Sequence, residues 1–242
     1  MALSGGMALP LVACQAGAAP RAGPAAAVPA LAGSEAAVRA RANAFRAESG
    51  LAPLAPERAL QEAARAFAAY MAESDHYGHE ADGRTPAQRS EAAGYRWCAV
   101  AENIAYVMRS DGFATEELAR RLMDGWIASP GHRRNLQDGD MTQTGVAIAH
   151  STRTGRYYAV QLFGRPRDAR VRFDIRNSGR QPTRYTLGEQ AFDLPPGTTR
   201  THEQCRAEPL RLPGRGAAVA PRDGAHYRLE PAGAGDWRLV EG

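Results

Sequence analysis

Residues 74–89 read SDHYGHEADGRTPAQR, residues 101–105 read AENIA, and residues 126–135 read WIASPGHRRN. These three segments contain two histidines, His79 and His132, and one acid, Glu102, that interrupts an apolar run. Histidine is suited to proton transfer and metal binding near neutral pH, and a carboxylate in apolar surroundings must be paired or hydrogen-bonded. We therefore take His79, Glu102 and His132 as the candidate site.

Each of these residues also has a purely structural interpretation. His79 follows a helix in a segment that must turn sharply, where a solvated histidine is common. Glu102 could tie down a loop or pair with an arginine, and His132 could interact with a helix dipole. Of their neighbours, His76 is interpreted as a solvated or supporting residue and Trp126 as a packing residue.

Helical periodicity predicts four helices in the first half of the chain, over residues 34–50, 57–73, 86–93 and 115–128. Ser34 and Thr115 are the expected N-caps of the first and the last. In the second helix, Leu60, Phe67 and Met71 fall on one face with Ala64 and are expected to be buried. The turn at residues 129–131 is expected to end the last helix, so that His132 would follow a helix end.

Alternating apolar residues predict the strands. Residues 97–108 are strand-like, and residues 144–151 and 156–164 are expected to pair across a turn near Thr154 and Gly155. After Arg165 the chain consists of short alternating runs separated by Ser-Gly, Pro-Pro-Gly and Asp-Gly turns, over residues 171–177, 183–187, 189–194, 209–212, 226–231 and 236–240. This pattern of short alternating runs and turns predicts a small all-β module, a sandwich, over residues 168–242.

Composition and charge exclude some classes of function. Of the 242 residues, 44% are hydrophobic, which is enough to bury a core. All 30 basic residues are arginine, and the formal net charge is +4. Residues 35–164 hold 15 arginines against 16 acids, and residues 165–242 hold 14 arginines against 10 acids. Nucleic-acid binding needs a denser basic patch, so we do not expect it.

Residues 1–33 are almost entirely Ala, Gly, Pro and Leu, which is typical of an export leader followed by a flexible tether. Residues 11–14 (LVAC) resemble a bacterial lipobox in which Cys14 is lipidated, although no basic residue precedes it and Pro10 interrupts the apolar run. We expect a protein exported to the periplasm, the exterior or a lipid-anchored position on the envelope. No transmembrane helix is expected in the mature chain.

The cysteines Cys14, Cys98 and Cys205 are too few for a disulfide scaffold. If Cys14 is removed or lipidated, Cys98 and Cys205 could pair, which fits an oxidising compartment. Cys98 is a poor candidate nucleophile, because its apolar neighbours indicate burial or a disulfide rather than an exposed, electropositive setting.

Seven segments between residues 35 and 164 resemble, in order and spacing, the bacterial branch of the CAP superfamily (cysteine-rich secretory protein, antigen 5 and pathogenesis-related 1; SCP-like domains). They are NAFRAESGLAPL, LQEAARAFAAYMA, HYGHEADGRTPAQRSEAAGY, AENIA, WIASPGHRRNL, TQTGVAIA and YYAVQLFG. The resemblance implies an α+β fold, in which residues 34–164 form an α-β-α sandwich with a shallow cleft lined by histidine and acidic residues.

Carried over by position, His79 matches the family's first cleft histidine, Glu102 the glutamate of its GENI signature, and His132 the histidine of its bacterial SPGH signature. Ala101 departs from the usual glycine before Glu102. Asp140 and Met141 stand where animal and plant members carry a second cleft histidine. The resemblance therefore suggests His132 as the substitute for that missing ligand.

Members of the family have been linked to zinc binding, to sterol or lipid binding and to proteolysis, which gives three hypotheses. In the first, the chain is a binding module whose cleft holds zinc, with His79 and His132 as ligands, or a small molecule, lipid or envelope component. In the second, it is a metal-dependent hydrolase with Glu102 as general base. In the third, it is a structural envelope protein with a vestigial cleft.

Binding is favoured over hydrolysis. The chain has no HExxH and no GxSxG motif. Two histidines also leave a zinc site one protein ligand short of the usual catalytic three, unless His76 or Asp82 joins. Two roles are open for the C-terminal module. We favour a stabilising role, in which a Cys98–Cys205 disulfide joins the module to the first domain, over envelope attachment through its arginines.

Overall fold

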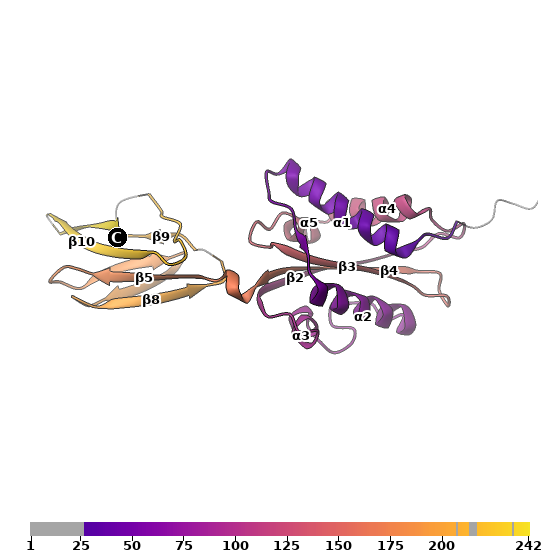
Figure 1. The fold of residues 1–242 in the computed structure, drawn as a ribbon, viewed down its shortest axis with the longest axis horizontal. Helices are drawn as coiled ribbons and strands as arrows, with labels where there is room; N and C mark the ends of the chain where they lie inside the picture. The colour runs from indigo at the N-terminus through magenta and orange to yellow at the C-terminus, as the bar shows by residue number, and fades with distance from the viewer. Residues whose placement is uncertain (1–26, 207, 213–216, 234) are drawn as a thin grey trace, which may run out of the picture.

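The computed structural model describes residues 27–206, 208–212, 217–233 and 235–242. It contains an α-β-α sandwich and a β module that lie end to end (Figure 1). The proposed lipidation site Cys14 lies outside the described residues. In the described part of the chain, no helix combines the length and the apolar character needed to cross a membrane.

A four-stranded sheet with helices on both faces forms the sandwich (Figure 1). In the order β1-β3-β4-β2, its strands are β1 (Ala55–Pro56), β3 (Gln143–His150), β4 (Tyr157–Pro166) and β2 (Trp97–Val107). The helices α1 (Leu31–Glu48), α4 (Thr115–Ala128) and α5 (Pro130–Leu136) cover one face, and α2 (Arg58–Ser74) and α3 (Pro86–Ala92) cover the other. This arrangement confirms the predicted fold class.

Each face of the sheet has its own apolar core. The α2 residues predicted to face inward, Leu60, Ala64, Phe67 and Met71, are all at most 1% exposed, as are Leu118, Leu122 and Trp126 of α4. A Cβ atom at Gly145 of β3 would lie 2.3 Å from the backbone of Leu60, so only glycine lets α2 approach the sheet this closely. The helical period thus predicted the packing correctly.

Both expected N-caps were wrong, for one physical reason. The helix α1 begins three residues before Ser34, and α4 is capped by Ala114 rather than Thr115. The Ser34 hydroxyl donates a hydrogen bond to the Thr115 carbonyl (2.9 Å), and the Thr115 hydroxyl accepts one from the backbone of Ala30 (3.0 Å). These side chains join the starts of two helices instead of capping their own.

The turn at residues 129–131 also behaves differently from its prediction. It ends α4 at Ala128 but starts α5 directly, with Pro130 as the first helical residue. Proline is favoured there because its fixed φ suits a helix and its missing N–H would have no partner in the first turn. His132 therefore lies inside a short helix and not after a helix end.

The C-terminal module is a two-sheet β sandwich. Its strands are β5 (Val171–Asn177), β6 (Thr183–Leu187), β7 (Gln190–Leu194), β8 (Thr199–Gln204), β9 (Leu210–Arg211), β10 (His226–Gly233) and β11 (Asp236–Glu241). They form sheets in the orders β11-β10-β5-β8 and β7-β6-β9, around a core that includes Phe173, Tyr185 and Tyr227. The sequence missed β8, since this edge strand is polar and largely exposed and shows no apolar alternation.

Several contacts hold the junction between the two parts. The chain crosses it through the helical turn η1 (Arg167–Ala169), and Cys98 of β2 is bonded to Cys205, with a Cα–Cα distance of 5.2 Å. Arg206 forms an ion pair with Asp138 (2.6 Å). Arg165 donates hydrogen bonds to Asp140 and, at 2.8 Å, to the carbonyl of Ala169. A disulfide and an ion pair therefore connect the β module to the α-β-α sandwich at this junction.

Arg46 is a buried cation bonded to backbone instead of to an acid. It is 1% exposed and donates to four carbonyls at 2.8–3.1 Å, those of Ala52, Leu136, Asp138 and Met141. Burial lowers the pKa of Arg46, although the nearby Asp138 opposes this effect. The end of α1 is thereby tied to the end of α5 and to the loop before β3.

We expect the substitution Arg46→Met to lower the free energy of unfolding by about 3 kcal/mol or more, because four carbonyls lose their donor. Urea unfolding followed by circular dichroism measures this. Arg41→Met is the matched control, since Arg41 lies on the same helix, is 42% exposed and pairs with the exposed acid Glu116; it should cost less than about 1 kcal/mol. Equal losses in the two variants would contradict the role of Arg46.

We predict that the Cys98–Cys205 disulfide forms in the exported protein. Peptide mass mapping without reductant should recover the two cysteines in one cross-linked pair, and reduction should separate it. Free thiols at both positions would rule the bond out.

Candidate functional site

Glu102 lies on the edge strand β2, with a carboxylate that is only 1% exposed. Its Oε1 is 2.8 Å from Nδ1 of His79, and its Oε2 accepts a hydrogen bond from Nη2 of Arg89, also at 2.8 Å. Arg89 is itself 5% exposed, so a buried cation balances the buried anion. Both interpretations of Glu102 hold at once, because it pairs with an arginine and contacts a candidate site histidine.

Arg89 organises the loop that carries His79. Its Nη1 donates to Asp82 (2.7 Å) and to the carbonyl of Arg84 (2.6 Å), and its Nη2 also donates to the carbonyl of His79 (2.8 Å). The guanidinium stacks over the Phe67 ring, 3.5 Å from its centroid. Its Nε is buried without a partner among the described residues. The loop is thus held from inside by one side chain.

Local sequence fixes the position of Arg89 in α3. Thr85 and Gln88 form a reciprocal capping box at the start of α3, which fixes the first turn of the helix that presents Arg89. The other end of the loop is anchored by Asp75, which accepts hydrogen bonds from Arg153 (2.8 Å) and Tyr158 (3.0 Å). The loop therefore has a fixed beginning, middle and end.

The imidazole of His79 is partly open to solvent, with 51% of its side chain exposed. A carboxylate accepts hydrogen bonds, so Glu102 favours the tautomer with the proton on Nδ1. The lone pair of His79 then resides on Nε2, the nitrogen not bonded to Glu102. The geometry therefore offers an oriented nitrogen that can bind a ligand or accept a proton.

Two asparagines dock α5 beside Glu102. Asn103 donates to the carbonyl of His132 (3.1 Å), and Asn135 donates to the carbonyl of Glu102 (3.1 Å) and to the Asn103 side chain (2.9 Å). Asn103 is a fully buried residue of β2. Amides in such a place satisfy backbone groups that a sheet edge leaves open.

The pKa of His132 is lowered by burial and, secondarily, by the positive charge of His79. The two imidazoles are thus close enough to interact electrostatically. The structure brings together all three residues singled out from the sequence, and it adds Arg89, Asn103 and Asn135. An arginine partner for Glu102 was one of the sequence interpretations, but nothing in the sequence identified Arg89 as that arginine.

The donor set does not fit a closed zinc site. Among the described residues, no group of three or more His, Cys, Asp or Glu side chains is placed to hold a metal ion. Glu102 uses both oxygens on His79 and Arg89, and Asp82 is bonded to Arg89. His76 is exposed, and its ring has no hydrogen-bond partner in the described part of the chain. The imidazoles of His79 and His132 remain as donors.

An aromatic strip lies beside the site. Tyr77 and Tyr106 are both exposed and meet edge to face, with ring centroids 5.1 Å apart. The pKa of Tyr77 is raised by burial of its hydroxyl, by the neighbouring Tyr106 hydroxyl and by the carboxylate of Glu102. The Tyr77 hydroxyl donates to the carbonyl of Ile104 (3.2 Å), which also accepts from buried Trp126 (3.2 Å). Trp126 is thus a packing residue, as predicted.

The model of the cysteine-rich secretory protein family, CAP, matches residues 40–163, just over half of the chain. The chain belongs to the CAP family. The matched region begins within α1 and ends in β4, and it contains all six residues that build the site. The β module lies outside it.

Three bacterial proteins illustrate what this CAP protein is similar to. The uncharacterized protein YkwD of Bacillus subtilis (strain 168) is 28% identical over 124 residues, which are 51% of this chain and 44% of that protein. The chain thus spans less than half the length of this curated relative. Among solved structures, an outer surface protein of Borrelia burgdorferi is 20% identical with a TM-score of 0.48, over 55% of this chain and 93% of that one. An extracellular SCP-domain protein of Bacillus anthracis is 21% identical with a TM-score of 0.48, over 56% of this chain and 41% of that one.

We expect His132 to titrate below the usual histidine value of about 6.5. The unfolded chain then binds a proton here more readily than the folded one, so stability should fall as pH drops below about 6.5. NMR titration of the imidazole measures the pKa, and His79→Gln should raise it by removing the neighbouring positive charge. His150→Gln, at the far end of β3, is the control and should leave it unchanged. An unchanged pKa in His79→Gln would contradict the proximity of the two rings.

Proposed function

We propose that this chain is an exported bacterial protein whose CAP domain is a binding module, with the ligand held at His79 and His132. One observation carries the proposal, namely the 2.8 Å contact between buried Glu102 and half-exposed His79. Arg89 already pairs with Glu102, although it shares its charge with Asp82. The additional bond to His79 fixes a ring that faces solvent, which has little structural value but preorganises a binding nitrogen.

A divalent transition-metal ion such as zinc is the ligand that two imidazoles suit best. A carboxylate that accepts the Nδ1 proton of a histidine fixes the tautomer and makes Nε2 a better metal ligand. With two protein ligands, the metal would keep free coordination positions and could exchange, unlike zinc in structural sites with four protein ligands. When bound, zinc would supply a Lewis acid that can coordinate an oxygen of a small molecule, and the exposed aromatic strip of Tyr77 and Tyr106 could contact its apolar part.

The geometry gives less support to a hydrolase in which Glu102 is the general base. A general base must reach the proton that it removes. The carboxylate of Glu102 is buried, and both of its oxygens are engaged. In this arrangement Glu102 is a positioning residue for His79.

Export is part of the proposal. It is supported by the Cys98–Cys205 disulfide, since such bonds persist mainly in oxidising compartments. The Ala- and Pro-rich composition of residues 1–33 is consistent with a leader and tether.

Zinc titration by calorimetry tests the binding site. The wild-type protein should bind one zinc ion, and His79→Ala and His132→Ala should each weaken binding at least about tenfold, because each removes a donor. Glu102→Gln keeps both donors but loses the fixed tautomer, so we expect a loss of about 10- to 100-fold. Circular dichroism checks that each variant is folded.

The control for this titration is His150→Ala, an exposed histidine that stacks on Tyr157 at the far end of β3 and should bind zinc like the wild type. No zinc binding in the wild type would favour a structural protein with a vestigial cleft. Zinc-dependent cleavage in a peptidase screen would instead establish the hydrolase.

A further inference from the structure

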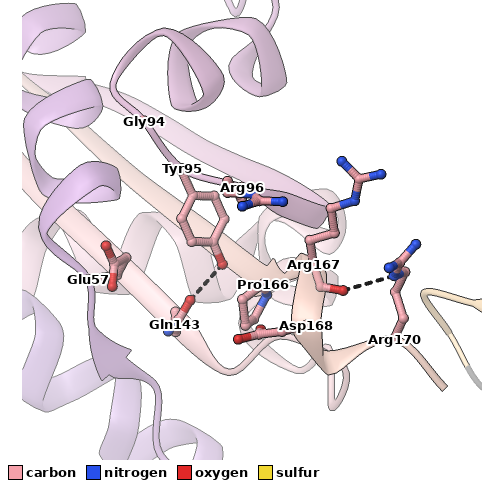
Figure 2. Close-up of a pocket in the computed structure, with 9 residues that line it drawn as sticks. All are labelled: Glu57, Gly94, Tyr95, Arg96, Gln143, Pro166, Arg167, Asp168 and Arg170. Atoms are coloured by element: carbon pink, nitrogen blue, oxygen red, sulfur yellow. Dashed lines mark hydrogen bonds between the residues drawn. The ribbon is translucent and has the colours of Figure 1, made fainter.

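A cavity of about 550 Å³, lined by charged, polar and apolar groups, lies at the junction of the CAP domain and the β module (Figure 2). Its volume falls within the range of small-molecule sites. It is separate from the histidine site, as none of its lining residues belongs to that site. The residues that matter for its chemistry are Glu57, Tyr95, Arg96, Gln143, Arg167 and Asp168.

Charges of both signs face this cavity without pairing with each other. Within the described residues, Arg96 and Arg167 make no ion pair, and neither do Glu57 and Asp168. Arg170 at the rim differs, because it pairs with Glu203 (2.8 Å). Glu57 caps α2, with its Oε1 accepting a hydrogen bond from the backbone of Ala59 (3.2 Å), so its Oε2 is the oxygen that remains for a ligand. Two guanidiniums and two carboxylates without ion-pair partners around one cavity suit a ligand that itself carries both charges.

The floor between the charges is neutral and fixed. Tyr95 is buried, and its hydroxyl donates to Oε1 of Gln143 (2.7 Å; Figure 2). Burial raises the pKa of Tyr95, and the negative charges of Glu57 and Asp168 raise it further, which places both acids within electrostatic reach of the hydroxyl. The amide nitrogen of Gln143 has no partner among the described residues and can donate to a ligand.

The charged groups are distributed along the cavity. Figure 2 shows Glu57 on one side and Arg167 on the opposite side, with Tyr95 and Gln143 between them. Asp168 follows Arg167 directly and disfavours a multiply charged anion such as phosphate at the basic end, whereas a single carboxylate remains acceptable. Figure 2 also shows the carboxylate of Asp168 extending toward Gln143 and the guanidinium of Arg96 beside Tyr95, so both charges are present in the middle of the cavity, between Glu57 at one end and Arg167 at the other.

Hydrogen bonds fix the backbone of the walls, whereas the side chains of Arg96, Arg167 and Asp168 are exposed. The backbone N–H of Arg167 donates to the carbonyl of Arg96 (2.8 Å), and Nε of Arg170 donates to the carbonyl of Arg167 (3.0 Å). The disulfide of Cys98, two residues after Arg96, closes the same junction. A preorganised site loses less free energy to ordering when it binds.

We propose that this cavity binds a small zwitterionic peptide, such as a dipeptide with both ends free. Its carboxylate would bind Arg96 and Arg167, its ammonium group would face Glu57, and its amide would contact Gln143. Such a dipeptide has two sources, proteins, which give L residues, and bacterial cell walls, which also contain D residues. The chemistry that the cavity recognises is the same for both.

Calorimetric titration with L-alanyl-L-alanine and with D-alanyl-D-alanine tests the proposal and separates the sources. Saturable one-to-one binding of at least one dipeptide is expected, and the tighter stereoisomer identifies the source. The N-acetylated and C-amidated forms should each bind about tenfold more weakly, since each removes one charge. Failure of both dipeptides to saturate at about 10 mM, or equal binding of the blocked forms, would overturn the proposal.

Substitutions of the lining residues test whether the dipeptide binds in this cavity. Arg167→Gln and Glu57→Gln should each weaken the dipeptide about tenfold. Arg180→Gln is the matched control, because Arg180 is an exposed arginine beyond the far end of β5 and should have no effect. His79→Ala should also leave dipeptide binding unchanged, which keeps this test independent of the zinc site. Unaltered binding in Arg167→Gln would place the ligand elsewhere and contradict the proposal.

Discussion

The ion pair between Arg89 and Glu102 is the interaction on which the histidine site depends. Both groups are buried, so removing either one would break a buried ion pair, at a cost of about 3–5 kcal/mol. Each partner also makes further contacts, since Glu102 holds the ring of His79 while Arg89 holds its carbonyl and stacks on Phe67 of α2. One buried pair thus connects α2, α3, β2 and the loop that presents the exposed imidazole.

The same contacts protect the edge of the sheet. β2 is an edge strand, and unpaired backbone groups on such strands invite association with other chains. Here the carbonyl of Glu102 accepts from Asn135, and that of Ile104 accepts from Tyr77 and Trp126. The loop that carries His79 and the helix that carries His132 therefore cover this edge. The same contacts form the site and prevent the edge from pairing with another chain.

Periodicity and the family resemblance predicted the sandwich and its cores, because those features follow from local pattern and order along the chain. They also singled out His79, Glu102 and His132, whose role as a site stays a prediction. Features that depend on distant partners were not predictable. Ser34 looks like a cap until Thr115 lies beside it, and an acid such as Glu102 demands a cation without specifying which of the 30 arginines supplies it. The turn at residues 129–131 was ambiguous, since proline can follow one helix and begin the next. The division into separately folding domains stays a prediction.

The segment from α3 through β2 contributes to both sites, with Arg89 and Glu102 at one and Arg96 at the other. Shared structure does not imply coupling, which requires an element with two arrangements that both ligands bias. β2 is paired with β4 along its length, its middle is held by the Arg89–Glu102 pair, and the disulfide of Cys98 holds its start. Such a strand has no alternative register available without exposing its buried face. The two sites should therefore bind their ligands independently, as fixed features of one rigid strand.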